Sequence, residues 1–180
     1  MFYLFREIIN LATYFHAIEI LKSYFLIKND FAKAGIENIV KNTHFMGRWQ
    51  VMSSNPLTIC DVAHNIGAFQ YLVSQIDNFN IKNIHIIIGF VEDKDIESIL
   101  QILPDFPQYY LCKAPVQRAL SPKILLTKFN EYHLNAQIIN ESTFKTFQKV
   151  QKLATPNDLI LITGSFFIVG DFLDQYQKNS

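Results

Sequence analysis

Three side chains of different chemistry lie within one short stretch of this sequence. Arg48 follows Gly47, and the segment Asp61-Val62-Ala63-His64-Asn65, which begins thirteen residues after the arginine, adds a carboxylate and an imidazole. A guanidinium offers paired donors to phosphate or carboxylate groups, and a carboxylate can accept hydrogen bonds from ribose hydroxyls. In open α/β sheets, ligands bind beyond the carboxyl ends of the strands, where this segment is expected. The pattern therefore predicts a phosphate or nucleotide site.

Each of these residues also has a structural interpretation. His64 or Asn65 suits the cap that begins a helix, and Asp61 suits a buried carboxylate whose hydrogen bonds are made within the protein. Most single arginines are surface or ion-pair residues, so Arg48 alone does not identify a ligand. At the level of the residues, both interpretations stay open.

Further candidates follow the other predicted strands. Lys94 lies between two aspartates, Arg118 is the charged residue of its loop, and Ser165 follows a glycine at the start of a helix. Each also has a structural alternative. Lys94 suits a solvated turn with local ion pairs, Arg118 a plain surface loop, and Ser165 an ordinary helix cap. Ser165 lacks the Gly-x-Ser-x-Gly pattern of hydrolases, so it is not expected to be a nucleophile.

The composition indicates a folded domain without affinity for nucleic acid. Hydrophobic residues make up 49% and charged residues 18% of the chain, which is enough apolar material for a buried core. Sixteen basic and sixteen acidic residues give a formal net charge of zero. Because binding to nucleic-acid phosphates needs clustered Lys and Arg, a nucleic-acid partner is not expected.

The cysteines and histidines do not predict a metal centre. Cys60 and Cys112 lie in separate apolar runs without a CxxC pair, and the histidines show no ligand spacing. Buried thiols of this kind are typical of a reducing, cytoplasmic setting. Residues 1–27 are apolar but interrupted by side chains such as Arg6 and Lys22, so they predict neither a signal peptide nor a membrane span.

Apolar periodicity divides the chain at about residue 46. Residues 1–46 read as helical, with a first helix over 3–25 that is apolar on nearly all sides. From Gly47 onward, strands alternate with helices, and several strands are continuous apolar runs, as is typical of a sheet covered on both faces. This predicts a doubly wound α/β domain over 47–180, with a mostly parallel sheet of about six strands.

The expected elements of this domain have the following bounds. Strands are expected at 49–53, 58–62, 83–90, 108–113, 136–139 and 158–163, and helices at 66–76, 94–103, 122–132, 141–153 and 165–176. Asp93 is the expected cap of the helix that begins at 94.

Taken together, the motifs resemble the C-terminal domain of the folylpolyglutamate synthase/dihydrofolate synthase family, within the Mur ligase superfamily. The resemblance covers about residues 47–175, and the first 46 residues resemble the last helices of the family's central ATPase domain. The sequence departs from the family pattern at Val62, where glycine is usual. The matching motifs are Gly47-Arg48, Pro56 before the strand that ends in Asp61-x-Ala63-His64-Asn65, Asp93-Lys94-Asp95, Arg118-Ala119 and Thr163-Gly164-Ser165-Phe166.

The resemblance implies a ligase that uses ATP and Mg²⁺ to activate a pteroate or folate carboxylate as an acyl phosphate, which the amine of L-glutamate then attacks. ATP, L-glutamate and dihydropteroate or folate are the implied partners of the intact enzyme. Arg48 and Asp61 are implied to bind ATP, and His64 to act at the catalytic centre. Ser165, Lys94 and Arg118 are implied to contact glutamate or another anion, and no metal ligand is implied on this chain.

No phosphate-binding loop of the Gly-x-x-x-x-Gly-Lys-Ser/Thr kind occurs in the 180 residues. We therefore expect an incomplete part of the enzyme, inactive without an N-terminal ATPase domain, whose apolar first helix favours self-association. One alternative is the corresponding domain of a peptidoglycan-precursor (Mur) ligase, against which Val62 and Asn65-Ile66 argue. The other is a non-catalytic α/β binding module, against which the retained Arg48, Asp61 and His64 argue.

Overall fold

A computed structural model describes residues 2–77, 79, 81 and 83–179. The chain divides into two compact units, Met1–Met46 and Gly47–Ser180. The first unit contains three helices, α1 (Phe2–Lys22), α2 (Asn29–Glu37) and α3 (Ile39–Thr43). That this unit belongs to an ATPase domain stays a prediction. In the described part of the chain, no helix is long and apolar enough to cross a membrane.

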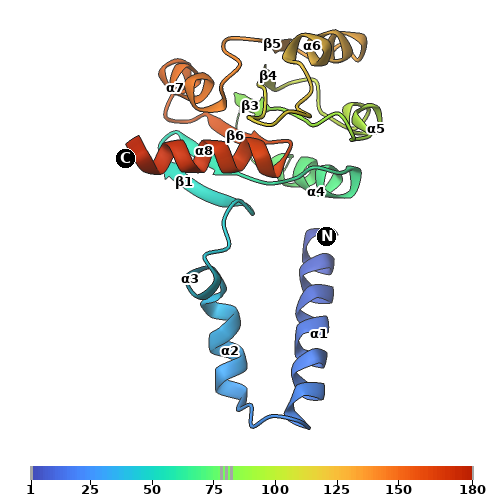
Figure 1. The fold of residues 1–180 in the computed structure, drawn as a ribbon, viewed down its shortest axis with the longest axis vertical. Coiled ribbons are helices and arrows are strands. Elements are labelled where there is room, and N and C mark those ends of the chain that lie inside the picture. Colours follow the sequence, from blue (N-terminus) through green and yellow to red (C-terminus); the bar gives the residue numbers. More distant parts are fainter. Residues whose placement is uncertain (1, 78, 80, 82, 180) are drawn as a thin grey trace. The chain divides into compact units, whose positions relative to one another are not determined.

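The second unit is built around a six-stranded sheet with the strand order β1-β2-β6-β3-β4-β5 (Figure 1). β1 pairs antiparallel with β2, and all other neighbouring strands are parallel. This confirms the predicted α/β fold with a mostly parallel sheet. The strands are β1 (Gln50–Ser54), β2 (Leu57–Cys60), β3 (Ile84–Ile88), β4 (Gln108–Leu111), β5 (Ala136–Gln137) and β6 (Leu159–Thr163). The helices are α4 (Ile66–Ile76), α5 (Ile96–Leu100), α6 (Pro122–Glu131), α7 (Thr143–Leu153) and α8 (Phe166–Asn179).

Alternating side chains of the strands build one apolar core on each face of the sheet. Ile86 and Leu161 pack on the face covered by α4, α5 and α6. Ile87 and Ile162 pack on the face covered by α7 and α8. Every residue of β6 is buried because this strand lies between β2 and β3 under both helical layers. Burying one such side chain stabilises the fold by about 1.5–3 kcal/mol.

The loops at the carboxyl edge of the sheet approach one another closely through Gly164 and Gly89. A Cβ atom added to Gly164 would lie 2.5 Å from the Gly89 carbonyl oxygen, and one added to Gly89 would lie 2.4 Å from the Cys112 carbonyl oxygen. Gly164 also has a φ of 106°, a conformation that side-chain-bearing residues rarely adopt. The ends of β6, β3 and β4 are therefore packed backbone against backbone.

Most element bounds differ from the expected ones by a few residues, and α4 begins and ends as predicted. The largest difference concerns α5, which begins at Ile96 instead of 94. Asp95, not Asp93, is its cap, because Asp95 Oδ1 accepts a hydrogen bond from the Ser98 amide at 3.2 Å and Oδ2 from the Ser98 hydroxyl at 2.6 Å. β5 is shorter than expected because it lies at the sheet edge, with β4 as its one neighbour.

Candidate functional site at the carboxyl edge of the sheet

The hairpin of β1 and β2 brings Arg48 to Asp61. Because the two strands are antiparallel, the residues just before β1 lie beside the residues just after β2. The Val62 amide donates to the Gly47 carbonyl oxygen at 2.7 Å, and the Trp49 amide donates to Asp61 Oδ2 at 2.9 Å. Both neighbours of Arg48 in the chain are thus bonded to the aspartate segment. The exposed guanidinium and the carboxylate lie at the same end of the sheet.

Asp61 is a half-buried carboxylate held by backbone amides. Besides the bond from Trp49, its Oδ1 accepts a hydrogen bond from the Ala63 amide at 2.9 Å. Burial raises the pKa of Asp61 above its ordinary value, and the two amide hydrogen bonds and the charge of Arg48 offset part of this increase. The hydrogen bonds within the protein therefore replace only part of the hydration that this carboxylate loses on burial.

His64 lies in the loop after β2 and contacts the start of α8. Its Nδ1 is 2.9 Å from the Val62 carbonyl oxygen. A carbonyl oxygen only accepts, so Nδ1 carries a proton and Nε2 is the nitrogen left for other chemistry. The ring centroids of His64 and Phe166 are 4.9 Å apart. The cap of α4 is Asn65, whose Oδ1 accepts from the Ala68 amide at 2.9 Å, so His64 does not serve as that cap.

Ser165 lies at the start of α8 and has the hydrogen bond of an ordinary helix cap. Its side chain is buried, and Oγ accepts from the Ile168 amide at 3.1 Å, while the hydroxyl proton can still be donated. The neighbouring Thr163 was not among the predicted site residues. Its hydroxyl is buried and has no hydrogen-bond partner among the residues that the structure describes. The one sequence signal for it is a polar residue at the end of an otherwise apolar strand.

Arg118 and Lys94 lie in the loops after β4 and β3, and these loops are joined. The Glu92 amide donates to the Arg118 carbonyl oxygen at 3.0 Å. Arg118 Nη1 lies 3.3 Å from Asp93 Oδ2, and the guanidinium lies over the Phe167 ring at 5.4 Å from its centroid. The cation is therefore held in place by a carboxylate and an aromatic ring, and Lys94 is half-buried in the same pair of loops.

The strand order determines which candidates meet. β6 lies between β2 and β3, so the loop that carries Ser165 adjoins the loop of His64 on one side and the loop of Lys94 on the other. The loop of Arg118 follows β4, one strand further along the sheet. Two consecutive residues of α8 connect these groups, because Phe166 contacts His64 and Phe167 contacts Arg118. The role of Phe167 as the platform of Arg118 was not predicted from the sequence, since it depends on the packing of α8 beside the loop after β4.

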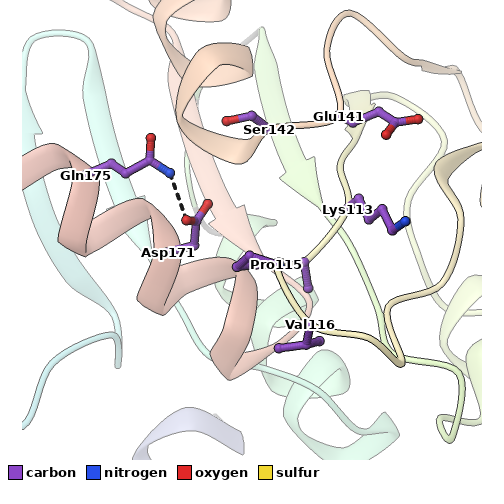
Figure 2. Close-up of a pocket in the computed structure, with 8 residues that line it drawn as sticks. Lys113, Pro115, Val116, Glu141, Ser142, Asp171 and Gln175 are labelled. Atoms are coloured by element: carbon purple, nitrogen blue, oxygen red, sulfur yellow. Dashed lines mark hydrogen bonds between the residues drawn. The ribbon is translucent and has the colours of Figure 1, made fainter.

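A separate cavity of about 470 Å³ lies beside the loop after β4, the start of α7 and the middle of α8 (Figure 2). None of the predicted site residues lines it. The lining residues are Lys113, Ala114, Pro115, Val116, Glu141, Ser142, Asp171 and Gln175.

Across the described positions, no group of three or more His, Cys, Asp or Glu side chains could hold a metal ion. The side chains that the structure describes therefore do not fit a magnesium site.

The fold is an α/β domain with a mostly parallel sheet, and charged and polar side chains lie in the loops beyond the carboxyl ends of its strands. The family model of the Mur ligase, glutamate ligase domain, matches residues 47–166, which is more than half of the chain. The chain belongs to this family.

Within this family, the chain is similar to proteins whose names include folylpolyglutamate synthase. The chain is 34% identical over 139 residues to a dihydrofolate synthase/folylpolyglutamate synthase of Buchnera aphidicola subsp. Acyrthosiphon pisum, covering 77% of this chain and 33% of that protein. It is 27% identical over 145 residues to a probable bifunctional folylpolyglutamate synthase/dihydropteroate synthase of Haloferax volcanii, covering 81% and 17%. A solved bifunctional folylpolyglutamate synthase/dihydrofolate synthase of Yersinia pestis, with Mn, AMPPNP and L-glutamate bound, matches with a TM-score of 0.64 at 27% identity, covering 74% and 32%.

The predicted resemblance to the C-terminal domain of the folylpolyglutamate synthase/dihydrofolate synthase family is thus confirmed. The chain spans about a third or less of the length of these relatives.

Proposed function

We propose that this chain is the nucleotide- and glutamate-binding C-terminal part of a cytoplasmic ATP-dependent ligase that adds glutamate to dihydropteroate or folate. The relatives support the reaction class, because folylpolyglutamate synthase is part of each name and the Yersinia pestis structure holds a nucleotide analogue and glutamate. The observation that carries the proposal is the hairpin contact that places Arg48 beside Asp61.

The proposed reaction has two steps. A carboxylate oxygen of the pteroate or folate attacks the γ-phosphorus of ATP, so that ADP leaves and an acyl phosphate forms. The amine nitrogen of glutamate then attacks the acyl carbon, the tetrahedral intermediate releases phosphate, and the nitrogen loses a proton to give the amide. Both steps require neutralisation of charge at the phosphoryl group and close placement of amine and acyl carbon.

The edge residues suit these requirements. In the proposed complex, Arg48 neutralises nucleotide phosphate charge and Asp61 accepts hydrogen bonds from ribose hydroxyls. His64, whose Nδ1 is occupied by the Val62 carbonyl oxygen, presents Nε2 as an acceptor for the proton of the attacking amine. Ser165, Lys94 and Arg118 are proposed to contact the carboxylates of glutamate or another anion.

Magnesium has no assigned ligand on this chain, since the described side chains do not fit such a site. In the proposal it would accompany ATP in the intact enzyme, and no step is derived through it. Because the 180 residues contain no phosphate-binding loop, we propose that the chain alone does not catalyse ligation and acts together with an N-terminal ATPase domain.

Isothermal titration with ATP tests the nucleotide site. We expect weak binding by the chain and a loss of at least about tenfold in affinity for Asp61→Ala, because a charge-assisted hydrogen bond contributes about 1.5–3 kcal/mol. Asp77→Ala is the matched control, since Asp77 is an exposed aspartate at the far end of α4. An equal loss in both variants, or no binding by the unaltered chain, would contradict the proposal.

A ligation assay tests the need for a second domain. The purified chain is incubated with ATP, L-glutamate and dihydropteroate, and glutamylated product is measured by mass spectrometry. We expect no product, and product formation would show that the chain suffices by itself. Titrating a separately produced ATPase domain into the same assay is expected to restore activity, and Asp61→Ala is expected to prevent this.

A further inference from the structure

The cavity beside α8 is open to solvent, shares no residue with the proposed nucleotide site, and is lined by segments that backbone hydrogen bonds connect. The Lys113 amide donates to the Glu141 carbonyl oxygen at 2.8 Å, which ties the loop after β4 to the segment before α7. The Val116 amide donates to the Ala114 carbonyl oxygen at 2.8 Å within the first of these segments. Asp171 lies six residues after Ser165, or about 9 Å along a helix, so the cavity is distinct from the start of α8.

A carboxylate without a cationic partner faces this space. Asp171 is half-buried, and in the part of the chain described by the structure its side chain has one hydrogen bond, accepted by Oδ1 from Gln175 Nε2 at 2.7 Å. Figure 2 shows these two side chains of α8 turned toward each other on one side of the cavity. Because Gln175 directs its nitrogen to Asp171, its Oε1 and the second carboxylate oxygen remain as acceptors.

The charges of the lining leave this carboxylate uncompensated. Lys113 is the one basic residue of the lining, and Figure 2 shows its amine directed away from Asp171, on the same side of the cavity as Glu141. One lysine against two carboxylates gives the lining a net charge of −1. Burial raises the pKa of the adjoining Cys112 thiol to about 12, with an opposing hydrogen bond from Thr146 and a further increase from the charge of Asp171.

Apolar residues of the loop after β4 also line the cavity. Pro115 and Val116, from the loop after β4, lie on the side of the cavity next to α8 (Figure 2). A hard metal ion usually takes six or more oxygen ligands, and among the described residues no cluster of metal-ligating side chains occurs here. A primary ammonium group instead needs up to three acceptors and tolerates an apolar chain on its other side.

We propose that this cavity binds a small organic cation, a primary ammonium group on a short apolar chain. The ammonium group of the ligand donates to the Asp171 carboxylate and to Gln175 Oε1, and the alkyl chain of the ligand packs on Pro115 and Val116. The proposal does not depend on the proposed ligase function, since none of these residues has a role in it.

The test is a titration of the isotope-labelled chain with n-butylammonium chloride, followed by amide NMR shifts at constant ionic strength. We expect saturable shifts confined to residues 113–116, 141–142 and 171–175, and no such shifts with n-butanol, which has the chain without the charge. Asp171→Asn is expected to weaken binding at least about tenfold, because a charge-assisted hydrogen bond is lost. Asp174→Asn is the matched control, since this exposed acid of α8 pairs with Lys178 at 2.7 Å.

A second variant keeps the proposal testable if Asp171→Asn does not fold. Val116→Lys adds a positive charge to the cavity, which repels the cationic ligand, and leaves Asp171 unaltered. This variant is expected to abolish binding. The proposal is wrong if n-butylammonium produces no saturable shifts, if n-butanol produces the same ones, or if Asp174→Asn weakens binding as much as Asp171→Asn. ATP titration of the same samples reports separately on the nucleotide site, so either proposal can fail alone.

Discussion

Two aspartates at opposite edges of the sheet show how surroundings separate a candidate functional carboxylate from a structural one. Asp61, at the carboxyl edge, has a raised pKa because burial outweighs its hydrogen bonds. Burial acts on the pKa of Asp158 in the same direction, but hydrogen bonds from Thr155 and Asn83, together with His85 Nε2 at 3.5 Å, outweigh it and lower that pKa. Asp158 is therefore satisfied within the fold, whereas Asp61 can gain from a ligand.

Asp158→Asn tests this assignment through the pH dependence of stability. Since the folded pKa of Asp158 is below its ordinary value of about 3.9, its stabilisation is present above that pH and is lost as pH falls through the folded pKa. We expect urea unfolding to report a loss of about 1–3 kcal/mol at pH 7 and a smaller loss at about pH 3. Asp174→Asn should change stability little at either pH. Equal losses at both pH values for Asp158→Asn would contradict the assignment.

At the scale of elements, apolar periodicity and helix-capping residues predicted most helices and strands. The prediction was ambiguous where two neighbouring residues could each cap the same helix. Asn65 begins α4 where the sequence predicted a cap, and the apolar run of β6 was predicted because it is buried on both faces. The predicted start of α5 was wrong because Asp93 and Asp95 can both cap a helix. Only the loop packing, in which Asp93 pairs with Arg118, decided for Asp95.

The backbone packing at the carboxyl edge leads to a paired prediction. Gly164→Ala should lower the free energy of unfolding by at least about 2 kcal/mol, because the added Cβ meets the Gly89 carbonyl oxygen and the backbone is in the left-handed region. Gly170→Ala, where a Cβ meets nothing within 4 Å in the middle of α8, should raise it by about 0.5–1 kcal/mol. Denaturant unfolding measures both, and destabilisation by Gly170→Ala as large as that by Gly164→Ala would contradict this account.

At the scale of the whole molecule, the first unit has much apolar surface. Each of the following side chains is at least 40% exposed: Leu11, Phe15, Ile20, Leu21, Tyr24, Phe25, Leu26 and Phe31. Exposed apolar surface of this extent is typical of a protein–protein contact. We therefore propose that this unit contacts either an ATPase domain or a second copy of the chain.

Sedimentation at a series of concentrations tests the second possibility. We expect concentration-dependent association of the chain, reduced by the double change Phe25→Ser and Leu26→Ser because it removes exposed apolar area. Leu153→Ser, in the second unit and about as exposed as Phe25, is the control and should leave association unchanged. A monomer across the whole range would exclude self-association.

The sequence by itself determined the alternation of strands and helices and which polar residues follow each strand, because both depend on local periodicity and turn chemistry. It also carried the family resemblance through motifs around Arg48, Asp61 and Ser165. Only the tertiary structure decided that β6 lies between β2 and β3, so that α8 presents Phe166 to His64 and Phe167 to Arg118. It also decided that the middle of α8, from Asp171 to Gln175, borders a cavity. Strand order and helix packing join residues far apart in the chain, and local patterns do not encode such contacts.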